Sequence, residues 1–122
     1  MLETGIDIIK VRRIAKAIES PAFVSKYFHP TEIEYSGKSP HVAEHFAVRF
    51  AAKEAVRKIL LSYIDKLSWL DSWIENDESG KPHLKFSYHI EKQVDIVHSS
   101  VSLSHTKDMA IASVILDVKI LK

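Results

Sequence analysis

Two carboxylates in this sequence have unusual neighbours. Asp7 lies inside the apolar run GIDII at residues 5–9, and Glu54 lies among cations in FAAKEAVRK at residues 50–58. A buried carboxylate without a counter-charge is costly, so Asp7 needs a cation or hydrogen-bond donors nearby. Mg²⁺ commonly binds one or two carboxylates together with phosphate oxygens. Glu54, embedded among cations, therefore suits a magnesium ion that is shared with a phosphate ligand.

Each carboxylate also has a simpler explanation. Asp7 could point outward from a strand and cap the helix that follows, because surface and capping acids are common. Glu54 could form an ion pair with Lys58 four residues later, which stabilises an exposed helix by about 0.3–0.5 kcal/mol. The local sequence leaves these alternatives open.

A row of cations accompanies Glu54 on the same stretch. Arg49, Lys53 and Arg57 follow one another at steps of four residues, so they lie on one side of a helix. Like charges at this spacing repel mildly unless an anion bridges them, and phosphate is an obvious anion for Arg and Lys. The row favours a phosphate-binding helix.

A polar segment, SLSHTKD at residues 102–108, separates two apolar runs. Ser104, His105 and Thr106 bring hydroxyl and imidazole groups to one turn, which suits a phosphate or a sugar. Turns are generally polar, so a hairpin turn without a ligand explains the segment equally well.

Metal sites built on histidine or cysteine are not expected. The chain has no cysteine, which excludes disulfides and thiolate ligands. His41 and His45 are four residues apart, but no third ligand accompanies them at a convincing spacing.

The composition predicts one globular domain that spans residues 1–122. The formal net charge of +1 gives no reason to expect a nucleic-acid partner. The N-terminus has no signal-peptide pattern, and no apolar run approaches the roughly 20 residues that span a bilayer. We therefore expect a cytoplasmic protein without a membrane partner.

Helices are expected mainly in the first half of the chain. After a strand at residues 4–9, apolar spacing predicts a helix at 10–19 that Pro21 ends or restarts. Thr31 as N-cap and Glu34 as its capping-box partner predict a short helix after Pro30. The longest helix should run from about Ser39 to residue 63 and carry Glu54.

Strands are expected mainly in the second half. The pattern predicts a hairpin of strands 69–76 and 83–88 around the turn NDESGKP, a short helix at 89–98, and strands at 101–104 and 110–121. This arrangement predicts the α+β class, with an antiparallel sheet packed against the long helix.

Four segments together resemble one enzyme family. GIDI at residues 5–8, RFAAKEAVRK at 49–58, SGKP at 79–82 and SLSH at 102–105 are similar in order and spacing to the holo-acyl-carrier-protein synthases, the small phosphopantetheinyl transferases. The resemblance covers nearly the whole chain and implies a 4′-phosphopantetheinyl transferase-like fold. It also implies transfer of 4′-phosphopantetheine from coenzyme A to a serine of an acyl carrier protein, which releases adenosine 3′,5′-bisphosphate.

The resemblance also implies roles for individual residues. Asp7 and Glu54 become Mg²⁺ ligands, and Lys58 joins them as a catalytic cation near the pyrophosphate. Arg49 becomes a contact to the 3′-phosphate of coenzyme A. The other implied contacts to the coenzyme are Lys53, Gly80, Lys81, Pro82, Ser104, His105 and Thr106. The group that accepts the serine proton stays open.

The implied partner is an acidic acyl carrier protein. A basic first helix with Arg13, Arg12 and Lys16 would steer and orient it, although a solvated basic face explains these residues too. The family implies a homotrimer with the coenzyme between subunits. This chain departs from the family where ILLSYIDKLSWLDSW, at residues 59–73, lacks the glycine that often follows the lysine.

Two other functions remain as alternatives. A non-catalytic module that binds carrier proteins would keep the fold and the basic helix, but it would not need the two acids. Another Mg²⁺-dependent phosphohydrolase would suit the local chemistry but not the ordered set of motifs. The carrier, whether it serves fatty-acid, polyketide or related synthesis, is not specified by the sequence, and neither is tolerance of acyl-coenzyme A.

Overall fold

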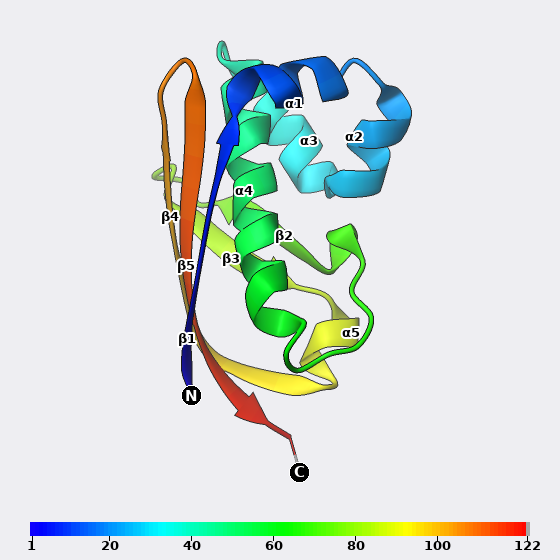
Figure 1. The fold of residues 1–122 in the computed structure, drawn as a ribbon, viewed down its shortest axis with the longest axis vertical. Coiled ribbons are helices and arrows are strands. Elements are labelled where there is room, and N and C mark those ends of the chain that lie inside the picture. The colour runs from blue at the N-terminus through cyan, green and yellow to red at the C-terminus, as the bar shows by residue number, and fades with distance from the viewer. Residues whose placement is uncertain (122) are drawn as a thin grey trace.

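The protein is an α+β domain, as predicted, in which helices pack on one face of an antiparallel sheet (Figure 1). The computed structural model describes residues 1–121. The elements follow in the order β1 (Leu2–Lys10), α1 (Val11–Ala17), α2 (Pro21–Tyr27), α3 (Pro30–Gly37), α4 (Val42–Leu60), a 3-10 turn (Trp69–Asp71), β2 (Ser72–Asn76), β3 (Pro82–Phe86), α5 (Tyr88–Glu91), β4 (Val94–His105) and β5 (Met109–Ile120).

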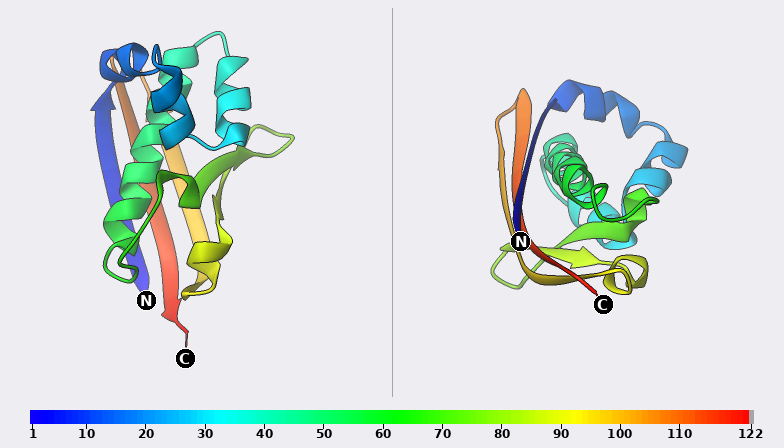
Figure 2. Two further views of the ribbon diagram at one scale, coloured as in Figure 1. Left: turned by 90° about the vertical axis from the view of Figure 1, so that its right-hand side faces the viewer. Right: turned by 60° about the horizontal axis from the view of Figure 1, so that its bottom comes forward.

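Two antiparallel units surround the long helix α4. The main sheet has the strand order β1-β5-β4, and β2 and β3 form a separate hairpin. Figure 2 shows α4 enclosed by the main sheet, the hairpin and the helices α1 to α3. Elements from both halves of the chain therefore converge on this helix.

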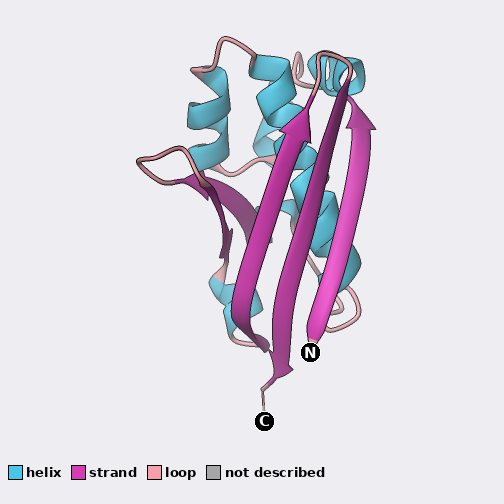
Figure 3. Cartoon of the chain, turned by 90° about the vertical axis from the view of Figure 1, so that its left-hand side faces the viewer, coloured by secondary structure: helices cyan, strands magenta, loops and turns pink. Residues whose placement is uncertain are grey.

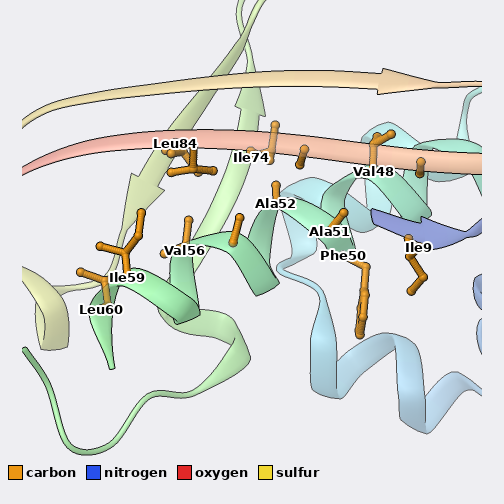
Figure 4. Close-up of a cluster of buried hydrophobic side chains, with 14 of the residues drawn as sticks. Ile9, Val48, Phe50, Ala51, Ala52, Val56, Ile59, Leu60, Ile74 and Leu84 are labelled. Carbon is orange, nitrogen blue, oxygen red and sulfur yellow. The ribbon is translucent and has the colours of Figure 1, made fainter. Parts of the chain in front are cut away.

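Small residues let α4 lie close to the sheet. Ala51, Ala52 and Ala55 are fully buried on the helix, and they belong to a core that also includes the larger apolar residues in Figure 4. Gly5 on β1 is required here, because a Cβ at this position would collide with the carbonyl oxygen of Ala55. The close approach holds the middle of β1 against the second half of α4.

The opposite face of the main sheet is not covered by a helix within residues 1–121, as Figure 3 shows. It carries exposed apolar side chains beside polar ones such as Ser102 and Ser104 of β4. Leu2, Ile6 and Ile8 on β1 are 71%, 59% and 60% exposed, and Ile115 on β5 is 44% exposed. Alternation along β1 then directs Asp7 toward α4. The alternative in which Asp7 points outward and caps the following helix is therefore wrong, since Lys10 is the N-cap of α1.

The predicted helix at 89–98 is also wrong over most of its length. Helix α5 ends at Glu91, and β4 already begins at Val94, which pairs with Ile120 of β5. Ile90 and Val94 have helical spacing but belong to different elements. Pairing with β5 determines the structure here, and a β-bulge between Ile96 and His98 adjusts its register.

The starts or caps of two helices, α3 and α4, differ from the predictions. Helix α3 has His29 as N-cap, and its capping-box partner is Glu32 rather than Glu34. The predicted restart at Pro21 is a separate helix, α2, capped by Ser20. Helix α4 begins at Val42 and ends at Leu60, so the predicted range 39–63 is too long at both ends.

The hairpin lies close to its predicted place, except that residues 69–71 form a 3-10 turn before β2. The strands β1 and β4 are longer than predicted at both ends, and β5 starts one residue before its predicted range.

Among the helices in the described part of the chain, none has the length and apolar character to cross a membrane.

Candidate functional site

Asp7 and Lys58 join β1 to α4. The Lys58 ammonium donates hydrogen bonds to Asp7 Oδ1 at 3.0 Å and to the carbonyl oxygen of Ile6 at 2.9 Å. The Asp7 side chain is 20% exposed and faces the helix. Asp7 is therefore a partly buried acid with a cationic partner.

Glu54 lies one helical turn before Lys58. It is half-buried, and within residues 1–121 its carboxylate has no hydrogen bond or ion pair. The alternative that Glu54 pairs with Lys58 is wrong, because Lys58 pairs with Asp7. Residues four apart on a helix are neighbours, so Glu54 lies on the helix side that faces Asp7.

The two carboxylates fit a magnesium ion better than a metal that needs an all-protein cage. In the described chain, no group of three or more His, Asp or Glu residues is arranged to hold a metal. Mg²⁺ usually takes one or two carboxylates and completes its shell with water and phosphate oxygens. Glu54 and Asp7 supply such a set of oxygens.

Arg49 lies in the interior, at 1% exposure. Its Nη2 donates to Asn76 Oδ1 at 2.7 Å, its Nη1 donates to the carbonyl oxygen of His45 at 3.1 Å, and its guanidinium lies over the ring of Tyr35 at 4.6 Å. Burial lowers its pKa from the ordinary value. The Nε is buried without a partner, so Arg49 keeps unused donors.

Lys53 has partners inside the chain, and its role as a coenzyme contact stays a prediction. Its ammonium is 2.8 Å from Glu32 and donates to the carbonyl oxygens of Trp69 and Ser72, and its side chain is only 2% exposed. Burial lowers the pKa of Lys53, and Glu32 opposes that shift. Lys53 therefore holds the start of the hairpin against α4.

The cation row is used for structure, so an anion is not needed to explain it. Arg57 donates to the carbonyl oxygen of Leu67 at 3.1 Å, and its guanidinium lies over Trp69 at 4.3 Å. Arg49 and Arg57 are thus hydrogen-bonded and lie over aromatic rings, and Lys53 has an anionic partner. That partner, Glu32 of α3, was missed by sequence reasoning.

The loop with Gly80, Lys81 and Pro82 is held by Asp77. This carboxylate accepts hydrogen bonds from the Ser79 hydroxyl and from the backbone N–H groups of Ser79 and Lys81, and it pairs with His83. The hydrogen bonds from Ser79, followed by that from His83, hold the pKa of Asp77 well below its usual range. Gly80 takes φ +89°, which favours glycine.

The dipeptide Asn76-Asp77 was also missed as a functional candidate. Asn and Asp are frequent where a turn begins, because their side chains bond to backbone groups further on. That tendency could have identified them as loop-organising residues.

The SLSH segment places its residues on opposite faces of β4. His105 pairs with Glu44 of α4 at 2.9 Å, and its ring lies 5.7 Å from that of His45. Burial lowers the pKa of His45, and Arg49 adds to the shift. Ser104 lies beside Ile111 on the uncovered face, so the single chain does not bring it together with His105.

Thr106 closes the β4–β5 turn. Its Oγ1 accepts hydrogen bonds from the N–H groups of Asp108 and Met109, which leaves its own hydroxyl proton free to be donated.

The exposed side chains of Arg12, Arg13 and Lys16 on α1 form no ion pair within residues 1–121. The predicted basic surface is present.

A pocket of about 420 Å³ opens beside Arg49. It is lined by Tyr35, Lys38, Ser39, Pro40, His41 and His45. Arg49 contacts two of these residues from beneath. The pocket therefore combines an aromatic ring, a lysine ammonium, two imidazoles and a serine hydroxyl group.

Comparison with known proteins gives a consistent result. The family model of the 4′-phosphopantetheinyl transferase superfamily matches residues 3–114. A holo-[acyl-carrier-protein] synthase of Geobacter sp. strain M21 is 38% identical, with 93% of this chain and 96% of the relative covered. One of Clostridium botulinum strain Alaska E43 is also 38% identical, with coverage of 93% and 95%.

The chain is also similar to solved structures of holo-(acyl-carrier-protein) synthases. The holo-(acyl-carrier-protein) synthase of Bacillus anthracis in complex with coenzyme A (3′,5′-ADP) is 34% identical, with a TM-score of 0.76 and 93% of each chain covered. The enzyme of Helicobacter pylori in complex with coenzyme A is 30% identical, with a TM-score of 0.79 and coverage of 94% of this chain and 100% of that chain.

Proposed function

Because the chain belongs to the 4′-phosphopantetheinyl transferase superfamily, we propose that it transfers 4′-phosphopantetheine from coenzyme A to a serine hydroxyl of an apo acyl carrier protein. It is an enzyme of the phosphopantetheinyl transferase class. The single observation that carries the proposal beyond family membership is the contact between Asp7 and Lys58, with Glu54 one turn away.

The reaction forms one P–O bond and breaks another. The serine oxygen attacks the phosphorus on the pantetheine side of the pyrophosphate, and adenosine 3′,5′-bisphosphate leaves with the bridging oxygen. In such reactions, positioning and charge stabilisation supply most of the acceleration.

Asp7 and Glu54 would hold Mg²⁺ on the side of α4 that faces β1. When bound, the ion would neutralise charge that develops on the pyrophosphate oxygens. Lys58 would add a fixed cation to the leaving group, and its bonds to Asp7 and to the Ile6 carbonyl restrict where the ammonium can lie. Asp7 therefore acts both as a ligand and as the group that orients Lys58.

The nucleotide end of coenzyme A would bind to a second group of residues. This group contains the predicted contacts Arg49, Gly80, Lys81, Pro82, His105 and Thr106, and the 420 Å³ pocket lies beside it. Arg49 has unused donors, and Lys81 has an exposed side chain without an ion pair in residues 1–121. Both observations support binding of an anionic nucleotide.

The uncovered face of the main sheet supports the predicted homotrimer. Leu2, Ile6, Ile8 and Ile115 give it an exposed apolar surface, and such surfaces mark interfaces when they are contiguous. Ser104 lies on the same face and would approach a coenzyme site only through a neighbouring subunit. Sedimentation equilibrium at micromolar concentration should give three chain masses, and a mass of one chain would contradict the proposal.

The basic helix α1 would bind the acidic carrier. We expect Arg13→Glu to raise KM for the carrier about tenfold and to change kcat little, because reversal of a rim charge mainly affects encounter and orientation. The defect should shrink as salt screens the charges. Initial rates over a range of carrier and salt concentrations measure both effects.

Lys92→Glu, at the C-cap of α5, is the matched control, since it reverses an exposed charge outside α1. An equal rise in KM for both variants would indicate a general charge effect and would contradict docking at α1. Reversal of Arg12 or Lys16 to Glu should also raise KM for the carrier, but by a smaller factor.

The decisive test of the function is intact-mass analysis of an apo carrier incubated with the protein, coenzyme A and Mg²⁺. The carrier should gain one phosphopantetheine, and no gain at any divalent-metal concentration would contradict the proposal. Carrier binding that needs neither coenzyme A nor metal, without any mass gain, would identify a binding module. Phosphate release without a carrier would identify a phosphohydrolase. The expected cytoplasmic location stays a prediction.

A further inference from the structure

Asn76 connects two parts of the nucleotide-binding end that different elements carry. It is the last residue of β2, and its Oδ1 accepts the 2.7 Å hydrogen bond from Arg49 Nη2 of α4. Its Nδ2 donates to the carbonyl oxygen of Gly80 at 3.0 Å. The single amide thus supplies an acceptor to Arg49 and a donor to Gly80.

Arg49 depends on this bond for its orientation. The guanidinium is buried, and its other polar contact goes to the carbonyl oxygen of His45 on its own helix. Tyr35 covers its face. Among residues 1–121, Asn76 is thus the side-chain acceptor that determines which N–H groups of Arg49 stay free.

The turn after Asn76 is folded by its own hydrogen bonds. The N–H of Asp77 donates to the carbonyl oxygen of Lys81, and the N–H of Gly80 donates to the carbonyl oxygen of Asp77, both at 2.9 Å. The Asp77 carboxylate adds its bonds to Ser79, Lys81 and His83. The turn therefore behaves as a preformed unit. Asn76 links this unit to α4 through its hydrogen bonds to Gly80 and to Arg49.

We propose that Asn76 is a positioning residue that sets Arg49 and the loop of Gly80, Lys81 and Pro82 at the spacing which the nucleotide end of coenzyme A requires. The inference rests on the proposed function, because it takes the nucleotide as the ligand of these groups. Asn76 acts through Arg49 and Gly80 and needs no contact of its own with the ligand.

The direct test is calorimetric binding of adenosine 3′,5′-bisphosphate, which carries the nucleotide end alone. Asn76→Ala should weaken its binding about 10- to 100-fold, since hydrogen bonds to charged groups contribute about 1.5–3 kcal/mol. KM for coenzyme A should rise by a similar factor, while kcat at saturating coenzyme A should change less than about threefold. A purely structural role would not separate KM from kcat in this way.

Asn76→Asp separates the two bonds of the amide. It keeps an acceptor for Arg49 but loses the donor to Gly80, and its negative charge lies beside the guanidinium. We expect it to keep the melting temperature within a few degrees of the parent and yet to weaken bisphosphate binding at least as much as Asn76→Ala. This variant keeps the proposal testable if Asn76→Ala folds poorly.

Gln93→Ala is the matched control, because it also removes an amide that donates to a backbone carbonyl, at His89 on α5. It should leave bisphosphate binding unchanged. Unchanged binding in both Asn76 variants, or a loss that Gln93→Ala shares, would overturn the inference. If the parent protein binds the bisphosphate but transfers nothing to a carrier, the proposed function fails while the Asn76 effect is still measured; no binding by the parent overturns the inference.

Discussion

Replacement of Asp7 by Asn, or of Glu54 by Gln, is expected to reduce the rate of phosphopantetheine transfer by about 100- to 1,000-fold or more. Loss of one preorganised group that stabilises transition-state charge already costs about 10²–10³ in kcat. Each of these carboxylates would also help to hold the ion that provides this stabilisation. Asp7→Asn additionally frees the Lys58 ammonium from its 3.0 Å contact.

The same changes should leave the fold nearly intact. Asp7 and Lys58 are 20% and 53% exposed, and ion pairs near the surface contribute at most about 1 kcal/mol. Glu54 has no partner to lose within residues 1–121. We therefore expect melting temperatures within about 5 °C of the parent, a range that corresponds to roughly 1 kcal/mol for a domain of this size.

Intact-mass measurement of carrier modification over time gives the rates, and Asp95→Asn provides the control. Asp95 is also a strand aspartate, but it is exposed and lies on β4 away from α4. It should retain full activity. Full activity in Asp7→Asn or in Glu54→Gln would remove that residue from the metal site. A higher Mg²⁺ concentration should restore part of the loss if one ligand remains.

The long helix and the hairpin could be predicted because their signals are local. Alanines and larger apolar residues recur at three- and four-residue steps along α4, and turn residues separate β2 from β3. The start of β4 could not be predicted in this way. Val94 continues a helical spacing from Ile90, but long-range pairing with Ile120 is stronger than this local pattern.

The direction of Asp7 shows a second limit of sequence patterns. Polarity alone favours a carboxylate outside and isoleucines inside, yet Ile6 and Ile8 lie on the uncovered face and Asp7 faces α4. Because apolar side chains also lie on the outer face of this sheet, an isoleucine on β1 does not mark the side that faces the core. The family motif implied that Asp7 belongs to one site with Glu54, which alternation along β1 does not indicate.

Lys53 shows a third limit, since its partner lies 21 residues earlier in the chain. Charge spacing along α4 indicated a binding row, but it could not reveal that α3 supplies Glu32 to the same place. Both side chains are buried, and the lysine ammonium lies 2.8 Å from the carboxylate. This pair leads to the largest stability effect that we expect in the molecule.

Lys53→Met should lower the free energy of unfolding by about 3–5 kcal/mol, because it leaves a fully buried carboxylate without its counter-charge. Glu32 would keep its bonds from the N–H groups of His29 and Ile74, at 3.0 and 2.9 Å, but these do not neutralise it. For a domain of this size, the loss corresponds to about 10–20 °C in melting temperature.

Lys53→Met combined with Glu32→Gln should regain part of this stability, because a neutral amide can still accept one of those backbone hydrogen bonds and leaves no buried charge. Lys38→Met is the matched control, since it breaks a lysine–glutamate contact of similar length, 2.9 Å, whose side chains are 75% and 70% exposed. The control should cost less than about 1 kcal/mol. Urea unfolding of the parent, these three variants and the single variant Glu32→Gln measures these differences, and the buried pair would lose its assigned role if Lys53→Met cost no more than Lys38→Met. A double variant as unstable as the sum of its single changes would likewise show that the two charges are not coupled.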